Sequence, residues 1–363
     1  MLTVLRTPTD QGAPTQAELA RATGLAHATV SNIVRDLTAA GVLETEPSSG
    51  RRGSAVRLAP GAGVVAGVDF GHSHVAVAVG DLTGRVLAEE WVTAEPSGHA
   101  ADLARAASIL ERIDPGAGPL RHVGLGLPAP VVNNVVRSSA IFPGWEGVDA
   151  AAATEAVFGA AAHVENDANL GALAEHRQGQ GRGHSASVFV KMGSGVGAGI
   201  MINDELFQGA DGTAGEIGHL TVDEQGPMCR CGSRGCLETY TSSEHLLRLL
   251  GPQLPVGSFA EVVVAANDGN VAARRVIEDA GLRLGWALGA VVNLLNPGIV
   301  ILGGATPQAG ELLLEPTRTG LRRHALDSVT DTPIVISALG DRASMVGAVQ
   351  LAAEHTELVH AGR

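Results

Sequence analysis

Hydrophobic residues near the N-terminus recur with the period of an α-helix. A segment from about His27 to Ala39 carries an apolar stripe at i, i+3, i+4 and i+7, the spacing that puts its members on one helical face. The stripe consists of Val30, Ile33, Val34 and Leu37. A shorter helical pattern precedes it at residues 16–22, and Gly24 supplies the turn between the two. Two helices joined by a short glycine turn at this spacing predict a helix-turn-helix.

The face opposite the stripe carries short polar side chains and one arginine, which suit base edges and phosphates in a DNA major groove. These residues are His27, Thr29, Ser31, Asn32 and Arg35. Two short strand-like stretches follow, and the segment that joins them contains Arg51 and Arg52, which can reach phosphate or the minor groove. An ordinary helical hairpin with a solvated face is the alternative. The added wing favours a winged helix-turn-helix.

Strand and helix patterns alternate from Val64 to the end of the chain, which predicts an α/β protein. Apolar runs predict strands at 64–71, 75–79, 84–87, 122–127, 162–164, 188–191, 200–202, 299–302 and 334–336. Longer amphipathic or alanine-rich stretches predict helices at 100–113, 170–177, 271–295 and 344–355. The segment 59–63 is rich in glycine and alanine and contains one proline, so we place a domain boundary there.

Composition and charge narrow the class of protein. The chain has 363 residues, of which 45% are hydrophobic, enough for two or three domains with buried cores. No apolar run approaches the roughly 20 residues of a membrane span, and the N-terminus lacks a signal-peptide pattern, so we expect a cytoplasmic protein without a membrane partner. The net charge is −13, yet residues 1–60 hold six arginines against five acids. This asymmetry favours the N-terminal segment as the part that approaches a polyanion.

All three cysteines lie within eight residues of one another and shortly after a histidine. The set is His219, Cys229, Cys231 and Cys236. One imidazole and three thiolates make a closed tetrahedral set for structural zinc, with no position left for water. Reduced cysteines around a redox centre are the alternative. A metal loop here would bring Glu216 and Glu238 next to His219, as acceptors and donors for hydroxyl groups of a carbohydrate.

Three further features can hold an anion or a ligand. Asp69 and Gly71 end the first predicted strand of the α/β region, and glycine occupies every second position from Gly193 to Gly199. Backbone N–H groups without nearby side chains can close on a phosphate there, although ligand-free turns are the alternative. Asp167 follows a short strand and opens a helix, the position at which α/β folds bind ligands. Simple capping of that helix by Asn166 or Asp167 is the other interpretation.

These motifs together resemble the ROK family (repressors, open reading frames and kinases), and specifically its transcriptional-regulator branch with an N-terminal winged helix. The most specific motifs are Cys-x-Cys-Gly-x-x-Gly-Cys-x-Glu at 229–238, Gly215–His219 and Glu165–Asn169. The resemblance covers nearly the whole chain. It implies two actin-like (ribonuclease H-like) α/β lobes of the sugar-kinase type behind the winged helix. The domains would then be 1–60 for the winged helix, 61–165 with the C-terminal helix 344–363 for the first lobe, and 166–343 for the second lobe with the zinc loop.

The resemblance also implies roles for individual residues. Residues expected to contact a sugar are Asn166, Asp167, Glu216, His219 and Glu238, with zinc bound by His219 and the three cysteines. In kinase members the aspartate matching Asp167 is the catalytic base, while glycine loops and magnesium hold ATP. The matching nucleotide positions here are Asp69, Gly71, Gly193, Gly195, Gly197, Gly303 and Gly304.

Two departures from the kinase pattern bear on activity. Kinase members carry a second glycine and a lysine in the first phosphate turn, whereas this chain has His72 and His74, so that a side chain stands where phosphate approaches the backbone. The family's Pro-Gly-Pro is Pro128-Ala129-Pro130 here, next to the implied sugar. ATP and magnesium would be needed only if the chain is a kinase.

The sequence therefore predicts a sugar-responsive transcriptional regulator, a repressor of carbohydrate genes that binds double-stranded operator DNA. The effector would be a small sugar or sugar phosphate, and the assembly a homodimer or homotetramer. One alternative is an ATP-dependent sugar kinase with an accessory DNA-binding domain. The other is a zinc-stabilised scaffold that binds a protein partner.

Overall fold

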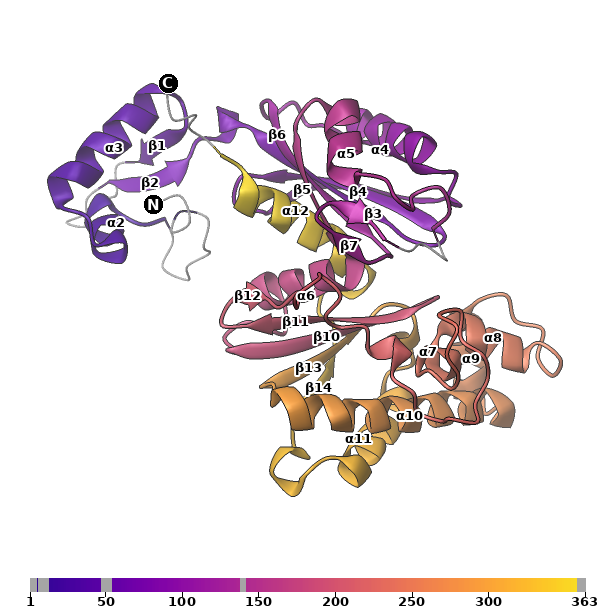
Figure 1. Cartoon of the computed structure of the whole chain (residues 1–363). Coiled ribbons are helices and arrows are strands. Elements are labelled where there is room, and N and C mark those ends of the chain that lie inside the picture. The colour runs from indigo at the N-terminus through magenta and orange to yellow at the C-terminus, as the bar shows by residue number, and fades with distance from the viewer. Residues whose placement is uncertain (1–4, 6–12, 47–53, 138–141, 358–363) are drawn as a thin grey trace.

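Two five-stranded sheets with helices on both faces form the body of the protein, and a small unit of helices and two strands precedes them (Figure 1). The structure is a computed structural model that describes residues 5, 13–46, 54–137 and 142–357. The N-terminal unit lies to one side of the first sheet, and the second sheet lies below the first in this view. The mixed α/β class predicted from the sequence is confirmed.

The N-terminal unit consists of helices α2 (Gln16–Thr23) and α3 (His27–Ala39) and strands β1 (Leu43–Glu46) and β2 (Ala55–Leu58). A capping box between Thr15 and Glu18 begins α2, and Gly24 ends it with φ +68°. Strands β1 and β2 pair antiparallel as the base of the predicted wing. A small core closes the unit, made of Leu19, Val30, Val34, Val42, Leu43 and Val56. Helix-turn-helix and wing are therefore both confirmed.

The first lobe is built on a sheet with strand order β5-β4-β3-β6-β9. Its strands are β3 (Val64–Phe70), β4 (His74–Asp81), β5 (Val86–Thr93), β6 (Leu120–Leu127) and β9 (Ala161–Asn166). Strands β3, β4 and β5 are antiparallel, whereas β3, β6 and β9 run parallel. Helices α4 (His99–Ile113) and α5 (Ala150–Phe158) cover one face, and α12 (Ala343–His355) covers the other. A small hairpin of β7 (Val131–Val132) and β8 (Val135–Val136) follows β6.

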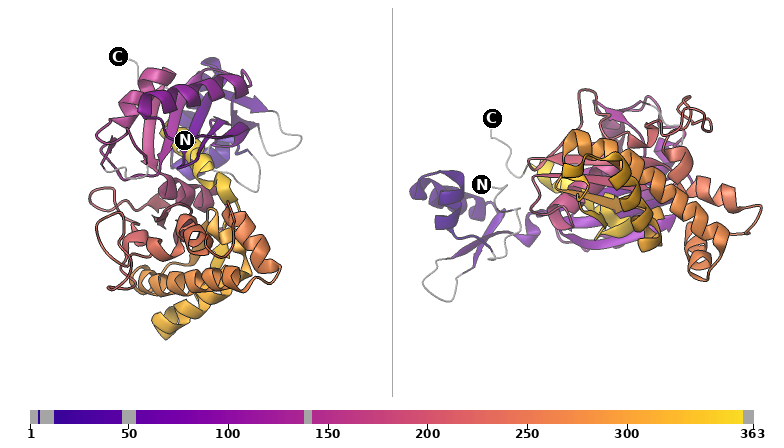
Figure 2. Two further views of the ribbon diagram at one scale, coloured as in Figure 1. Left: turned by 90° about the vertical axis from the view of Figure 1, so that its right-hand side faces the viewer. Right: turned by 90° about the horizontal axis from the view of Figure 1, so that it is seen from below.

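The second lobe repeats the same strand order and directions in β12-β11-β10-β13-β14. Its strands are β10 (Ala186–Met192), β11 (Val196–Ile202), β12 (Glu205–Leu206), β13 (Ile299–Gly303) and β14 (Ile334–Ile336). Helix α6 (Asp167–Gln178) covers its inner face, and α10 (Val271–Leu295) and α11 (Glu311–His324) cover its outer face (Figure 2). Helices α7 (Glu238–Thr241), α8 (Ser243–Leu250) and α9 (Phe259–Asn267) pack beside α10. Short 3-10 helices are η1 (Pro60–Ala62), η2 (Ile217–His219), η3 (Thr306–Ala309), η4 (Asp327–Val329) and η5 (Gly340–Arg342).

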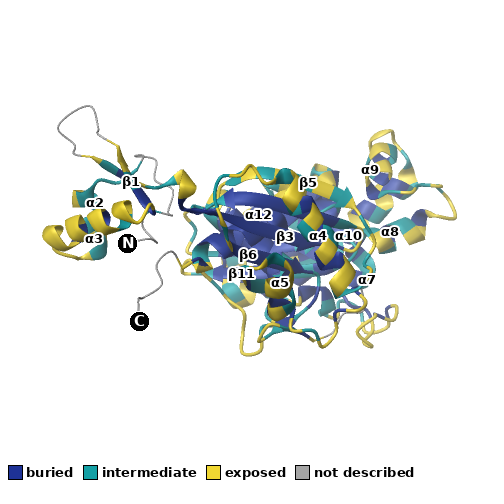
Figure 3. Ribbon diagram, turned by 90° about the horizontal axis from the view of Figure 1, so that it is seen from above, coloured by how far each residue is buried: buried dark blue, intermediate teal, exposed yellow. Residues whose placement is uncertain are grey.

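The two lobes meet through their inner helices, α12 and α6. Gly347 of α12 lies against the backbone of α6, where an added Cβ would be only 2.0 Å from the carbonyl oxygen of Leu170. Buried residues form a continuous dark band across β3 and α12, whereas α3 is largely exposed (Figure 3). This close helix pair joins the two lobes beside the space between the strand ends. No helix in the described part of the chain is long and apolar enough to cross a membrane.

Candidate functional site

A cavity of about 610 Å³ lies between the lobes, where β3, β6, β9 and β10 end. All five residues expected to contact a sugar line it, namely Asn166, Asp167, Glu216, His219 and Glu238. Of the residues expected at a nucleotide, the lining includes Gly71, Gly193, Gly195, Gly197 and Gly304, whereas Asp69 and Gly303 are buried and do not line the cavity. The parallel strand ends and the long segment between Leu206 and Glu238 therefore bring residues far apart in sequence to one place.

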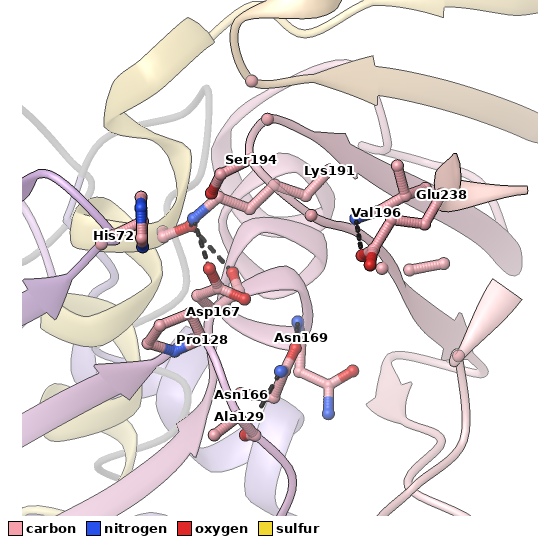
Figure 4. Close-up of a pocket in the computed structure, with 18 of the residues that line it drawn as sticks. His72, Pro128, Ala129, Asn166, Asp167, Asn169, Lys191, Ser194, Val196 and Glu238 are labelled. Atoms are coloured by element: carbon pink, nitrogen blue, oxygen red, sulfur yellow. Dashed lines mark hydrogen bonds and ion pairs between the residues drawn. The ribbon is translucent and has the colours of Figure 1, made fainter. Parts of the chain in front are cut away.

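Asn166 and Asp167 are neighbours at the junction between β9 and α6, but their side chains have different roles. Asn166 caps the helix, since its Oδ1 accepts hydrogen bonds from the N–H groups of Ala168 and Asn169 at 2.8 and 3.3 Å. Its Nδ2 donates to the carbonyl of Ala129 at 3.4 Å. The capping interpretation thus holds for Asn166, and it leaves the carboxylate of Asp167 directed into the cavity (Figure 4).

Lys191, which the sequence analysis did not single out, is the partner of Asp167. Its Nζ lies 2.8 Å from Asp167 Oδ2 and 2.9 Å from Ser344 Oγ (Figure 4). Ser344 in turn donates to the backbone carbonyl of Asp167 at 2.8 Å. The signal in the sequence was a lysine at the end of the apolar strand Val188–Lys191, just before the glycine loop. A charge at the end of a buried strand needs a partner in the fold.

The three charged groups shift one another's pKa. Burial raises the pKa of Asp167, and the charge of Asp69 raises it further, so that it stays above the ordinary value although Lys191 lowers it. Burial also works to raise the pKa of Asp69, but Lys191 and the hydrogen bond from His74 outweigh it and the pKa is lowered. Burial lowers the pKa of Lys191, yet Asp167 and Asp69 raise it above its usual range. Lys191 is therefore a permanent cation between two carboxylates.

The turn after β3 is filled by a side chain of the chain itself. The imidazole of His74 lies over Gly71, where an added Cβ would be 2.0 Å from the ring, and His74 Nε2 lies 3.2 Å from Asp69 Oδ2. Trp91 of β5 stacks on His74 at 3.8 Å between ring centroids. The N–H of Gly71 already donates to the carbonyl of His74. An anion approaching this turn would have to displace His74.

The histidine and three cysteines expected to bind zinc do come together. Their ligand atoms, one from each of His219, Cys229, Cys231 and Cys236, all lie within 4.8 Å of one another. Cys231 Sγ and Cys236 Sγ are 3.7 Å apart, close to the roughly 3.8 Å between two thiolates that each lie about 2.3 Å from a tetrahedral zinc. Burial and the neighbouring thiols raise the pKa of Cys236 to about 12, and a bound dication would reverse this shift. The donor set and its spacing fit a structural zinc ion.

The same loop carries a second unpredicted cation, Arg230, into the cavity. Its Nε lies 2.8 Å from Glu238 Oε1, and its Nη2 donates to the carbonyl of Ser194 at 3.1 Å. The N–H of Val196 donates to the other oxygen of Glu238 at 3.0 Å. Because Arg230 stands between two of the cysteines, a metal in the loop would fix the position from which it reaches Glu238.

Three acidic side chains that line the cleft, and Asp69 behind its wall, each have a basic neighbour. Asp69 lies beside His74, Asp167 beside Lys191, Glu238 beside Arg230, and Glu216 is 3.8 Å from His219. Burial raises the pKa of Glu216, helped by Asp167 and Glu238, although 40% of its side chain stays exposed. Among the described residues that line the cavity, four carboxylates face one lysine and one arginine. The cleft therefore carries a net negative charge, although individual carboxylates in it are paired with basic side chains.

The residues expected to contact DNA are exposed on one face of α3. His27, Thr29, Ser31, Asn32 and Arg35 all point to solvent, while Val30 and Val34 pack inside. Arg35 forms a 3.1 Å ion pair with Asp36 that leaves 69% of each side chain exposed. Arg51 and Arg52, expected in the wing, lie outside the described residues.

Comparison with known proteins assigns the chain to a family. A model of the ROK family matches residues 65–355. The chain belongs to the ROK family. A model of the MarR family matches residues 3–52, over the winged helix.

ROK relatives of two kinds resemble this chain. The xylose repressor of Caldicellulosiruptor bescii is 27% identical and aligns over 96% of this chain and 94% of its own length. The glucokinase of Thermotoga maritima is 31% identical over 79% of this chain and 96% of its own length. A solved ROK family transcriptional regulator, described as a homologue of the Mlc protein of E. coli, has a TM-score of 0.80 and 25% identity, covering 96% of this chain and 93% of that one. The alignments with the two regulators thus cover more of this ROK chain than the alignment with the kinase.

Proposed function

We propose that this ROK protein is a sugar-responsive repressor of genes for carbohydrate metabolism. The observation that carries the proposal is the combination of an exposed polar face on α3 with a cleft between two lobes that places hydroxyl-binding groups together. Residues 1–60 would bind double-stranded operator DNA, and the lobes 61–165 with 344–363 and 166–343 would bind the effector. The protein would act as a homodimer or homotetramer in the cytoplasm, since two recognition helices are needed to read two half-sites.

The sugar-binding set in this proposal is Asn166, Asp167, Glu216, His219 and Glu238. Carboxylates and an imidazole at these positions accept hydrogen bonds from sugar hydroxyls and hold their directions. Zinc bound by His219 and the cysteines would stabilise the loop that carries Arg230 and leads to Glu238. The negative balance of the cleft favours an uncharged sugar over a sugar phosphate, because a phosphate would add charge of the same sign.

Sugar kinase activity is the second candidate, and the raised pKa of Asp167 favours it because a more basic carboxylate removes a hydroxyl proton more readily. The position of His74 over Gly71 opposes it, since backbone approach to a phosphate is closed there. A coupled ATP-consumption assay over hexoses, pentoses and N-acetylated sugars, with Asp167→Asn as control, separates the two. Turnover that disappears in the variant would make the protein a kinase.

The repressor proposal is tested by fluorescence anisotropy and footprinting on the DNA upstream of its own gene. We expect a near-palindromic site whose half-sites lie about 10 base pairs apart, or a multiple of that distance. Arg35→Ala should weaken operator binding by about tenfold, because it removes a side chain from the recognition face. Arg275→Ala is the matched control, since this arginine of α10 is equally exposed and also ion-paired. Absence of any preferred site would refute the proposal.

A further inference from the structure

Lys191, Asp167 and Ser344 form a closed triangle of interactions that joins three elements. Lys191 belongs to β10 of the second lobe, Asp167 opens α6, and Ser344 is the second residue of α12. The three separations are 2.8 Å, 2.9 Å and 2.8 Å, and Ser344 is only 2% exposed. Hydrogen bonds and ion pairs that close on one another in this way favour one arrangement of their elements.

One corner of this triangle is also a corner of the proposed sugar site. The carboxylate of Asp167 lines the cavity and accepts from Lys191 through Oδ2. A sugar hydroxyl that donates to Oδ2 shares this oxygen with Lys191 and so weakens the bond between Lys191 and Asp167. Lys191 is also attracted by Asp69 of the first lobe and by Asp341 of η5. When the bond between Lys191 and Asp167 weakens, the attraction of Lys191 to Asp69 and Asp341 gains in relative strength.

Helix α12 connects this triangle to the DNA-binding unit. It has 13 residues, so that it spans about 20 Å. Met345, Val349 and Ala352 pack in one cluster with Ala62 of the segment that follows the winged helix, and Leu58 packs against the same cluster. Leu58 also packs against the core of the winged helix and pairs with Leu43 in the wing. A displacement of α12 thus has a continuous path of packed side chains to β2.

We propose that Lys191 and Ser344 are positioning residues that transmit occupancy of the sugar site at Asp167 to helix α12 and through it to the winged helix. The inference rests on the proposed function and specifies which side chains perform its regulation. Ser344 holds the start of α12 to the strand-to-helix junction at Asp167, and Lys191 holds both to β10. A sugar that engages Asp167 loosens this triangle, and α12 with its attached linker moves relative to the second lobe. The two lobe arrangements then differ in their affinity for both sugar and operator.

The test compares operator affinity with and without saturating sugar in the full-length protein. Anisotropy with the operator duplex is measured in the absence of sugar and with saturating D-xylose or D-glucose as probes. Saturation matters because the ratio of the two operator affinities then does not depend on how tightly each variant binds the probe. We expect a ratio of about tenfold or more in the wild type, within the usual range of allosteric coupling.

Ser344→Ala and Lys191→Met should each reduce this ratio to within about twofold of unity, and the double variant should cause no further loss, because both act through one triangle. The matched control is Ser187→Ala. Ser187 lies on the same strand and the same face as Lys191 and is as buried as Ser344, each being 2% exposed, but it is at the far end of β10. It should keep the wild-type ratio. Thermal unfolding of each variant confirms that it is folded.

The outcomes separate this inference from the proposed function. A wild-type ratio that survives in folded Ser344→Ala or Lys191→Met overturns the inference and leaves the repressor intact. Loss of the ratio in Ser187→Ala as well would also overturn it, since any buried change would then suffice. A wild type that binds a probe sugar in calorimetry without any change in operator affinity overturns both.

Discussion

The two lobes share one strand order but present opposite charges to the cleft. Asp69 is the sixth residue of β3 and lies opposite Gly126 of β6, while Lys191 is the sixth residue of β10 and lies opposite Gly303 of β13. Both side chains lie on the face of their sheet that the inner helices cover. A repeated topology thus delivers an anion and a cation to equivalent positions, and they attract each other across the cleft.

The hairpin turns that follow these two residues also differ between the lobes. Each turn has three residues, Gly71–Ser73 in the first lobe and Gly193–Gly195 in the second. In the first, the imidazole of His74 covers the glycine, whereas nothing lies within 4 Å of a Cβ added to Gly193. The difference shows that topology places a turn at the cleft, while one or two side chains decide whether it remains open to a ligand.

Loss of the metal loop should have the largest effect, and it is confined to the second lobe. Cys236→Ser removes a buried thiolate from the tetrahedral set, so we expect zinc content to fall from about one per chain to none, with a stability loss on the order of 5 kcal/mol. Elemental analysis and thermal unfolding measure the two effects. Ser233→Ala in the same loop is the control. Equal zinc content in Cys236→Ser would show that the cluster does not bind the metal.

Removal of the cation at the lobe interface should come second. Lys191→Met leaves Asp69 and Asp167 together without their shared counter-ion, which we expect to cost about 2–3 kcal/mol in urea unfolding at neutral pH, allowing for the partial exposure of the pair. The double variant Lys191→Met/Asp167→Asn should recover most of this loss, because it removes the uncompensated charge. A loss below that of Asp167→Asn alone would contradict the electrostatic role of Lys191.

The stability of the Lys191→Met variant should also depend on pH in a different way from that of the wild type. The pKa of Asp167 is already raised in the folded protein, so folding takes up a proton on this group between its unfolded and folded pKa, and stability falls as the pH rises through that window. Without Lys191 the pKa should rise further and extend the window upward. The deficit of Lys191→Met relative to the wild type should therefore shrink on going from pH 8 to pH 5. A deficit that grows on acidification would be inconsistent with this explanation.

The contact between the inner helices supports a somewhat smaller prediction. Gly347→Ala places a methyl group against the backbone of Leu170, which has no flexible end to move aside, so we expect a loss of about 1–3 kcal/mol. Chemical unfolding measures it. Gly61→Ala is the matched control, because nothing lies within 4 Å of its added Cβ. Unchanged stability in Gly347→Ala would mean that the lobes can separate at this contact without penalty.

The smallest expected effect concerns the turn Gly71–Ser73, which the imidazole of His74 covers. His74→Ala should open the approach to Gly71, and we expect weak binding of inorganic phosphate to appear, worth less than about 1 kcal/mol. Emission from Trp91, which loses its stacked neighbour, should change in the variant and respond further to phosphate. The wild type should not respond. Phosphate binding of equal strength in both proteins would show that His74 does not close this turn.

Much of the fold was determined by local patterns in the sequence. The apolar stripe from Val30 to Leu37 predicted a helix that the structure places at His27–Ala39, because helical periodicity is a property of neighbouring residues. Most strands of both sheets followed from their buried apolar runs, although the strand predicted at 200–202 begins at Val196. The strand predicted at 84–87 lies at Val86–Thr93, and β12 was not predicted. Helix α11 was missed because Pro316 lies within it, in spite of Leu313, Leu314 and Leu321 at helical spacing. The shorter helices α5, α7, α8 and α9 were also missed.

Part of the candidate site could likewise be predicted from local sequence, and part depends on contacts between distant segments. Spacing in the chain identified the histidine and cysteines of the metal loop, and the resemblance to the ROK family indicated Asn166, Asp167, Glu216 and Glu238. No local pattern indicated that Lys191 would meet Asp167, that Arg230 would meet Glu238, or that His74 would cover Gly71. Ser344 lies 177 residues from Asp167. Periodicity and motif spacing can be recognised from residues that are neighbours in the sequence. The pairing of charges and the filling of a turn depend instead on which distant segments the packed helices and sheets bring together.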